Sequence, residues 1–435
     1  MLPKINLLVC GNPRKHTQSF DALKAYLEEH NKRTEQTKST AHHVIRVFHL
    51  NFSKAQNKLV VCPPHAEKGL HSGEGATHND EDTPAPADVD VVLHKVHTFG
   101  DPSAVEAFSQ WMEEANKQRS ALSRPPIILI DPLEKVNLLT IRSTLYRLLD
   151  TDMENGVPVT FIPRTFQWAR DAGDMTPVGE RSSVPSKTDV DGGWWIAKPE
   201  EGTGPAYTHH LTMWRGKSLA MPPAVVADLP KEENKFIVQE FLANALPVVV
   251  KVYCIGDRIF VKVKPTTKLV KLLIDEKKED TPVKMDSQDG ALFQKEGQVA
   301  PSSCWNKFFS KDSIAYENVL QIAHNISNKT ELQLHLYGFD ILLLPLELAR
   351  DVHHYNVNTS HGIAAKAGSK VIKPDPQTSS EANSSLRLYT ASDMFDLETE
   401  TPTTLLNQSI PVTIDVNYSP ATRGWIPPTR ICLFD

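Results

Sequence analysis

Two apolar segments near the C-terminus carry carboxylates where a buried strand usually has none. In 412–417, Val-Thr-Ile-Asp-Val-Asn, polar residues alternate with apolar ones, so a strand would present Asp415 and Asn417 on one face. In 339–343, Phe-Asp-Ile-Leu-Leu, Asp340 is the single charge of an apolar run, and an unpaired charge there is costly. Two carboxylates and an amide oxygen form the oxygen-only set that Mg²⁺ takes when phosphates complete its shell. The pattern predicts a Mg²⁺ site; the alternative is that Asp340 pairs with a structural Arg and Asp415 caps a turn.

A predicted hairpin places three lysines on one face. A two-residue Gly-Asp turn at 256–257 joins two expected strands, 248–255 and 258–263, which are rich in β-branched residues. In this register Lys251 lies opposite Lys262, and Lys264 follows on the same face, beside Val249. Like charges that face each other destabilise a ladder, so we expect a bound polyanion such as a triphosphate or a phosphorylated substrate. A solvated edge strand blunted by lysine is the alternative.

A third candidate is Lys198, which ends the apolar segment Trp-Trp-Ile-Ala-Lys shortly before the small loop Gly202-Thr203-Gly204. A lysine ahead of such a loop can hold a nucleotide phosphate, with backbone N–H groups closing over it. His209 and His210 follow, but a metal role for them lacks a third ligand at a suitable spacing.

The elements expected to position these residues alternate between strand and helix over the first 150 residues, which favours a parallel α/β domain. Strands are expected at 5–10, 45–49, 89–93, 126–130, 157–162, 193–198, 236–241, 338–345 and 410–416. Helices are expected at 18–35, 138–149 and 313–327, the last of them capped by Asp312 or Ser313. Three polar tracts, 62–88, 275–302 and 366–408, are interpreted as insertions without a catalytic role.

Composition excludes several classes of protein. A length of 435 residues suggests about three domains, and 40% hydrophobic with 23% charged residues is typical of soluble globular chains. A formal net charge of −6 predicts no overall attraction to nucleic acid, and no apolar run approaches the length of a membrane span. Five scattered cysteines exclude a disulfide scaffold and indicate a reducing compartment, so a cytoplasmic location is expected.

Taken in order along the chain, these and neighbouring motifs resemble the inositol 1,3,4-trisphosphate 5/6-kinase family, also called the inositol-tetrakisphosphate 1-kinases. The matching blocks are Asp90–Lys95, Ile130–Pro132, Arg142-Ser143, Ala197-Lys198, Val238–Phe241, Lys251–Gly256, Tyr337–Asp340 and Ile414–Asn417 with Pro420. The resemblance implies an α/β ATP-grasp fold, with an N-terminal parallel α/β domain plus two α+β domains that clasp ATP. The implied domains are 1–152 on the substrate side (with insertion 62–88), a central 153–243, and a catalytic 244–435 (with insertions 275–302 and 366–408).

The resemblance also implies roles for individual residues. The metal ligands would be Asp340, Asp415 and Asn417. The ATP-binding residues would be Arg142, Lys198, Gln239, Glu240, Phe241, Leu242, Lys251 and Thr266. The substrate would meet Lys15, Lys95, His209, Lys251 and Asn417, with Arg14 as the alternative to Lys15 and His210 as the alternative to His209. The catalytic group would be Lys251, Lys264 and His209.

The activity implied is an ATP- and Mg²⁺-dependent kinase, with two ions at the site, that phosphorylates a hydroxyl of a soluble inositol polyphosphate. The substrate would be inositol 1,3,4-trisphosphate at the 5- or 6-hydroxyl, or inositol 3,4,5,6-tetrakisphosphate at the 1-hydroxyl. A monomer without nucleic-acid or membrane partners is expected. Departures from the family pattern, such as Ala243-Asn244 after the hinge and Thr266 in place of Ser, leave the hydroxyl undecided. A carboxylate–amine ligase and a non-catalytic inositol phosphate sensor are the alternatives; the lysines argue against the first and the intact carboxylates against the second.

Overall fold

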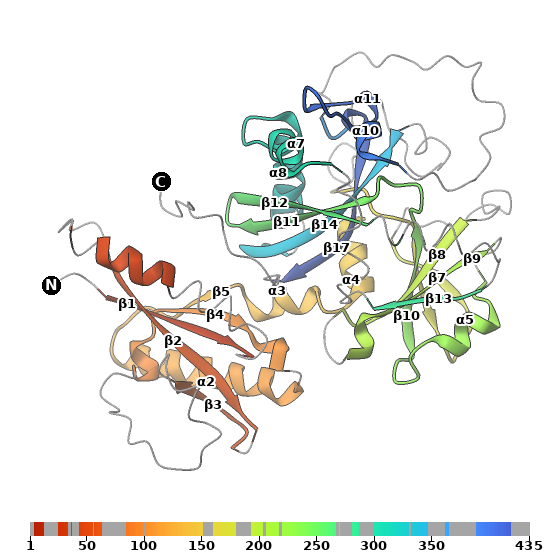
Figure 1. Ribbon diagram of the computed structural model, residues 1–435. Coiled ribbons are helices and arrows are strands. Elements are labelled where there is room, and N and C mark those ends of the chain that lie inside the picture. The colour runs from red at the N-terminus through yellow and green to blue at the C-terminus, as the bar shows by residue number, and fades with distance from the viewer. Residues whose placement is uncertain are drawn as a thin grey trace, which may run out of the picture. The chain divides into compact units, whose positions relative to one another are not determined.

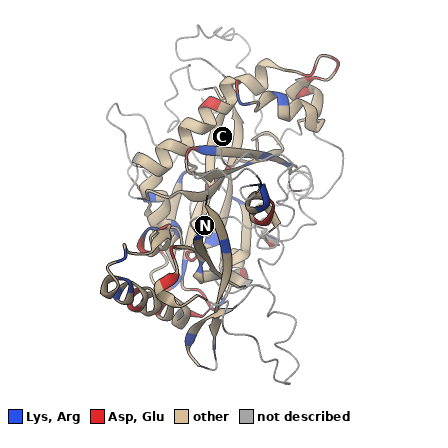
Figure 2. Ribbon diagram, turned by 90° about the vertical axis from the view of Figure 1, so that its left-hand side faces the viewer, with Lys and Arg blue, Asp and Glu red and all other residues tan. Residues whose placement is uncertain are grey.

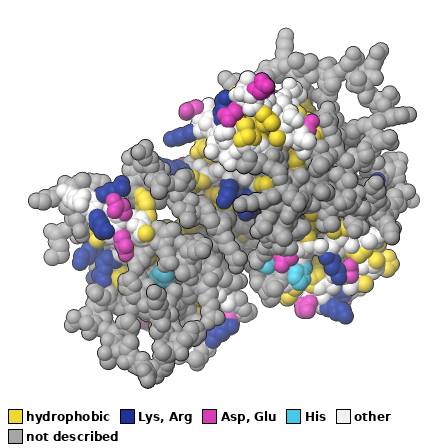
Figure 3. Space-filling view, viewed as in Figure 1, with side chains coloured by type: hydrophobic (Ala, Val, Ile, Leu, Met, Phe, Trp, Pro, Cys, Tyr) yellow, Lys and Arg dark blue, Asp and Glu magenta, His cyan; other side chains and the backbone are white. Residues whose placement is uncertain are grey.

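The computed structural model shows a mixed α/β protein that divides into two compact units, one up to Pro132 and one from Leu133 to Tyr418. Each unit is described by itself. The structure describes residues 4–12, 25–33, 36, 43–54, 56–62, 84–99, 101–150, 160–179, 193–202, 206–216, 220–266, 269, 281–286, 300–329, 332–346, 362–364 and 389–418. No described helix is long and apolar enough to cross a membrane. Acidic and basic residues are found in both units (Figure 2), and those on one face of the molecule can be seen in Figure 3.

The first unit contains a five-stranded sheet in the order β3-β2-β1-β4-β5. Its strands are β1 (Lys4–Gly11), β2 (Val44–Ser53), β3 (Lys58–Cys62), β4 (Val91–Lys95) and β5 (Ile128–Ile130). Four of these strands are parallel and β3 is an antiparallel edge, which confirms the predicted parallel α/β domain (Figure 1). Helix α2 (Pro102–Ala121), which we did not predict, contacts the sheet through Phe108, whose ring stacks on His94.

The second unit contains a six-stranded sheet in the order β13-β9-β8-β10-β6-β7. Its strands are β6 (Thr165–Ala169), β7 (Met175–Pro177), β8 (Gly193–Pro199), β9 (His210–Gly216), β10 (Lys235–Phe241) and β13 (Val283–Asp286). One face buries Phe166, Trp195 and Phe236 against Val225 and Leu229, at helix α5 (Pro223–Asp228). The opposite face carries Lys198 and Gln239, because side chains alternate between faces along each strand.

The second sheet of this unit has four antiparallel strands in the order β12-β11-β14-β17. They are β11 (Val248–Ile255), β12 (Arg258–Pro265), β14 (Leu336–Pro345) and β17 (Ser409–Tyr418). Further helices of the second unit are α3 (Leu133–Leu138), α4 (Arg142–Leu149), α7 (Ser302–Phe308) and α8 (Ile314–His324). Short turns of helix occur at η3 (Pro86–Asp88), η4 (Val96–Phe99), η5 (Ala206–His209) and η7 (Asn325–Lys329). A mostly parallel sheet in the first unit and two antiparallel sheets in the second confirm the predicted α/β class, with one parallel α/β domain and two α+β sheets.

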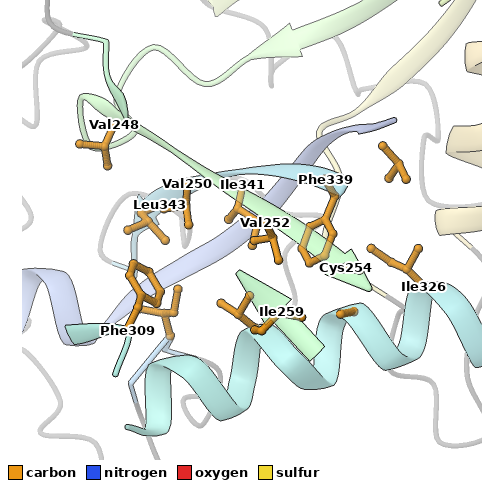
Figure 4. Close-up of a cluster of buried hydrophobic side chains, with 14 of the residues drawn as sticks. Val248, Val250, Val252, Cys254, Ile259, Phe309, Ile326, Phe339, Ile341 and Leu343 are labelled. Atoms are coloured by element: carbon orange, nitrogen blue, oxygen red, sulfur yellow. The ribbon is translucent and has the colours of Figure 1, made fainter. Parts of the chain in front are cut away.

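One face of the four-stranded sheet forms the main hydrophobic core of the second unit. Val250 and Val252 of β11 and Phe339 and Ile341 of β14 are almost completely buried. Figure 4 shows their side chains between the strands and the helical segment beside Ile326. Because every second residue enters this core, the intervening residues of the same strands must lie on the other face.

The predicted hairpin is confirmed, register included. Lys251 pairs with Lys262 across β11 and β12, and Val249 pairs with Lys264. The turn contains Gly256 with φ of 53°, a backbone conformation that favours glycine. The cap of the helix at 313–327 is Ser313, whose hydroxyl accepts a hydrogen bond from the Tyr316 backbone N–H.

Two of the predicted insertions are in part packed structure, which their sequence did not lead us to expect. In 275–302, β13 adds an edge strand to the six-stranded sheet and buries Val283. In 366–408, the described residues form α10 (Ala391–Met394), β15 (Phe395–Asp396), β16 (Thr401–Pro402) and α11 (Thr404–Asn407). Met394, Phe395 and Leu406 belong to the main core. The apolar residues of this tract are too few and too irregularly spaced for a sequence pattern to reveal them.

Phe395→Ala is therefore expected to destabilise the protein by about 3–5 kcal/mol, because it leaves a cavity in a packed aromatic cluster. The ring is 1% exposed and lies 4.9 Å, centroid to centroid, from that of Trp305. Leu397→Ala is the matched control, since Leu397 is 46% exposed. Urea unfolding of both variants measures the difference; equal small losses would show that this segment is not part of the core.

Candidate functional site

The predicted carboxylates and one predicted lysine lie side by side on three neighbouring strands. Lys251 of β11 pairs with Asp340 of β14, and Asp340 pairs with Asp415 of β17. Side chains of residues paired across an antiparallel ladder point to the same face, so these three share the face opposite to the core. Asn417 pairs with Gly338, which has no side chain to cover it. The fold thus brings four of the predicted site residues together.

Lys251 and Asp340 form an ion pair. The Lys251 Nζ lies 2.5 Å from Asp340 Oδ2, and the side chains are 24% and 19% exposed. Burial lowers the pKa of Lys251, but the charge and hydrogen bond of Asp340 outweigh it, and that pKa lies above its ordinary value. Burial raises the pKa of Asp340; the charge of Asp415 adds to this and that of Lys251 opposes it. The ion pair considered as an alternative for Asp340 therefore exists, with a lysine in place of the arginine.

The carboxylates and Asn417 fit a Mg²⁺ ion. Asn417 donates its Nδ2 hydrogen to Asp415 Oδ2 at 3.0 Å, so its amide oxygen is the end that can face a cation. Burial and the neighbouring charge of Asp415 raise the pKa of Asp340, so its charged form is disfavoured. A divalent cation beside the two carboxylates would compensate their charge and stabilise the charged form of both. Within the described ranges no three His, Cys, Asp or Glu side chains gather as a metal site. Two carboxylates and an amide therefore suit Mg²⁺ with phosphate oxygens completing its shell.

Lys264 is the lysine of this face whose charged form is destabilised by its lysine neighbours. It is half-buried, whereas Lys262 is exposed. Burial lowers the pKa of Lys264, and the charges of Lys251 and Lys262 lower it further, outweighing the attraction of Asp340. No ion pair of Lys264 occurs among the residues that the structure describes. A half-buried ammonium without an ion-pair partner among the described residues is a suitable group for binding an anion.

Lys198 extends from β8 towards the same region. Its Nζ donates to Gln239 Oε1 at 2.8 Å, and lies 3.3 Å from the Tyr146 hydroxyl and 3.5 Å from the carbonyl oxygen of Ile414 on β17. Burial lowers the pKa of Lys198 to about 8; the charges of Asp415 and Asp340 oppose this shift and that of Arg142 adds to it. Lys198 is therefore placed within electrostatic reach of both carboxylates.

Arg142, predicted to bind phosphate, is buried and contacts the backbone. Its Nη1 donates to the carbonyl oxygens of Pro199 at 2.6 Å and Glu201 at 3.0 Å. The neighbouring Ser143 hydroxyl donates to the carboxylate of Glu200, which is also buried. Burial raises the pKa of Glu200, while the bond from Ser143 opposes this. Helix α4 therefore holds the chain that leaves β8 directly after Lys198.

The predicted adenine hinge lies on β10 and just beyond it. The side chain of Gln239 is buried, with its amide nitrogen donating to Thr165 Oγ1 at 3.0 Å and its oxygen accepting from Lys198. Glu240 forms an ion pair with Arg164 at 3.1 Å. Phe241 packs against one apolar cluster and Leu242 belongs to another, and Thr266 is buried. The Gln239 and Glu240 side chains therefore already have polar partners within the protein.

The other predicted site residues that the structure describes lie on other elements. His209 is half-buried in η5 and His210 is exposed at the start of β9. Lys95 ends β4 in the first unit, next to His94, whose Nε2 lies 2.8 Å from the Asp131 carbonyl oxygen and whose pKa burial lowers to about 4. Arg14 and Lys15 lie outside the described residues.

Sequence reasoning missed Tyr146, Glu200 and Arg164. Tyr146 follows Arg142 by four residues, which places both on one side of a helix, and this spacing is the signal that would have revealed it. Arg164 also lies over the Trp195 ring at 5.7 Å, a contact between segments far apart in sequence that no local pattern predicts.

The chain matches no protein-family model and has no significant match among curated proteins. Similar solved structures include D-alanyl-alanine synthetase A from Vibrio cholerae, with TM-score 0.38, 11% identity, and coverage of 79% of this chain and 85% of that one. The D-alanine–D-alanine ligase from Helicobacter pylori has TM-score 0.38, 8% identity, and coverage of 78% and 87%. The D-alanine–D-alanine ligase from Bacillus anthracis complexed with ATP has TM-score 0.34, 7% identity, and coverage of 79% and 82%. At these scores the similarity assigns no function to this chain.

Proposed function

We propose that the protein is an ATP-dependent kinase that phosphorylates a hydroxyl of a soluble inositol polyphosphate. The observation that carries the proposal is the composition of one sheet face, where Lys251 and Lys264 lie beside Asp340 and Asp415. Carboxylates on such a face suit metal-bound phosphates, and lysines suit a second polyanion. A substrate with several phosphates matches this face better than one with a single carboxylate.

The residues of the site would act through position and charge. Asp340, Asp415 and Asn417 would hold Mg²⁺, which would neutralise phosphate charge. Lys198 would hold a nucleotide phosphate. Lys251 and Lys264 would contact the polyanionic substrate. None of these side chains needs to act as a general base, because positioning and electrostatics carry phosphoryl transfer.

The substrate class is tested by incubating the protein with Mg²⁺ and ATP and either a panel of inositol phosphates or pairs of amino acids. A kinase yields ADP and a more highly phosphorylated inositol, whose isomer NMR identifies. A carboxylate–amine ligase yields ADP, free phosphate and an amide. A sensor binds an inositol phosphate without a single turnover. Either of the last two results overturns the proposal. We further propose that the protein acts as a cytoplasmic monomer without nucleic-acid or membrane partners.

The kinase should lose ATP affinity in alkali as Lys198 loses its charge. Because the pKa of Lys198 in the ligand-free protein is lowered to about 8, the ammonium is present below that pH and lost above it. We expect kcat/KM for ATP to be level below about pH 7, to fall to about half near pH 8, and then to fall by up to about tenfold per pH unit. Lys198→Arg, whose guanidinium stays charged, should remove this fall. A profile for Lys198→Arg with the same alkaline fall would assign it to another group.

A further inference from the structure

Tyr146 joins the two sheets of the second unit at the candidate site. Its side chain is 0% exposed, and its hydroxyl donates to the carbonyl oxygen of Ile414 on β17 at 2.7 Å. The same hydroxyl lies 3.3 Å from Lys198 Nζ of β8, as an acceptor. The ammonium also lies 5.8 Å from the centre of the tyrosine ring. One phenol thus contacts a residue of each sheet.

The carbonyl group that Tyr146 contacts belongs to a β-bulge. Asp415 pairs with Asp340 and Thr413 pairs with Ile341, so Ile414 has no partner on β14. The bulge separates two residues that would otherwise share a face: Thr413 is 0% exposed, and its hydroxyl lies 2.7 Å from that of Thr160, whereas Asp415 is half-buried on the site face. A bulge leaves a backbone group unpaired and re-aims the side chain beside it. Here the free carbonyl group is satisfied by Tyr146 and by Lys198.

We propose that Tyr146 is a positioning residue, whose single hydroxyl fixes both the ammonium of Lys198 and the bulge that presents Asp415. The inference deepens the proposed function and rests on it. It says that one contact between the two sheets holds both the phosphate-binding Lys198 and the metal-binding Asp415 in place. A hydroxyl can accept from an ammonium and donate to a carbonyl group at the same time, and phenylalanine can do neither.

Other contacts of Lys198 agree with this role. Gln239 accepts its shortest hydrogen bond, so Gln239 and Tyr146 hold the ammonium from two directions. Burial raises the pKa of Tyr146 far above neutrality, so its hydroxyl keeps its hydrogen and remains a donor to Ile414. Tyr146 therefore acts through Lys198 and the bulge, without charge of its own.

Tyr146→Phe tests the proposal, because it removes the hydroxyl and keeps the ring. Affinity for ATP in the presence of Mg²⁺, measured by calorimetry, should fall by about five- to tenfold, the effect of one lost hydrogen bond at the site. The matched control is Tyr337→Phe, since Tyr337 is 2% exposed and its hydroxyl donates to the Ala323 carbonyl oxygen at 2.6 Å, on the core side of β14. The control should lose similar stability and keep its ATP affinity.

A double-mutant cycle with Lys198→Met separates positioning from a general structural effect. If Tyr146 acts through Lys198, the loss in affinity caused by Tyr146→Phe should largely disappear when Lys198 is already Met. For variants that bind ATP too weakly for calorimetry, the increase in melting temperature caused by up to millimolar ATP gives the affinity instead. Unchanged ATP affinity in Tyr146→Phe, or losses that simply add, would overturn the inference and leave the proposed function standing. Failure of the unmodified protein to bind ATP would overturn both.

Discussion

Asp415→Asn is expected to reduce kcat at least about 100-fold at saturating Mg²⁺, because it removes one of two carboxylates that would hold the cation against the phosphates. The fold should be retained. The charge of Asp415 raises the pKa of its neighbour Asp340, so its removal relieves a repulsion, and the free energy of unfolding should stay constant or rise slightly. Steady-state kinetics with ATP and an inositol phosphate, together with urea unfolding, measure the two effects.

Asp257→Asn is the matched control for this change. Asp257 belongs to the same four-stranded sheet but lies exposed at the turn between β11 and β12, far along the strands from Asp340. It should have wild-type kcat and stability. A kcat near wild type in Asp415→Asn would remove Asp415 from the metal site, and with it the proposed role of this sheet face.

Local patterns in the sequence were sufficient for the strands that carry the site. The alternation of residues 415–417 in β17, the Gly-Asp turn and the helix cap at Ser313 each depend on residues within a few positions of one another. The pairing of Lys251 with Lys262 was predicted correctly for the same reason, because a two-residue turn fixes the register of a hairpin.

Contacts between distant segments could not be predicted in this way. The ion pair of Lys251 with Asp340 spans 89 positions and depends on which strands become neighbours. The bulge at Ile414 breaks the strict alternation that we predicted, so Thr413 is separated from the face of Asp415. The carbonyl oxygen of Ile414 accepts a hydrogen bond from the Tyr146 hydroxyl, 268 positions away in the sequence, and a regular pattern of apolar residues contains no sign of this contact.

The ion pair also changes the argument about the lysine face. From the sequence, repulsion among the three lysines was expected to destabilise the charged forms of Lys251 and Lys264 equally. In the structure Asp340 compensates Lys251, which raises its pKa, whereas the pKa of Lys264 is lowered, first by burial and then by its lysine neighbours. The two lysines should therefore respond differently to removal, although both face the same proposed ligand.

Lys251→Met is expected to lower the free energy of unfolding by about 1–3 kcal/mol, because it leaves Asp340 without its partner beside another carboxylate. Lys264→Met should leave stability unchanged or slightly higher, since it removes an ammonium whose charged form the fold disfavours. Both changes should raise KM for the inositol phosphate or lower kcat, by about tenfold or more for a lost charge-assisted bond. Lys262→Met, at the exposed position opposite Lys251, should have the smallest effect. Urea unfolding and steady-state kinetics of the three variants decide the matter: if Lys264→Met destabilises the protein and leaves KM unchanged, that lysine is structural, and the polyanion must bind elsewhere.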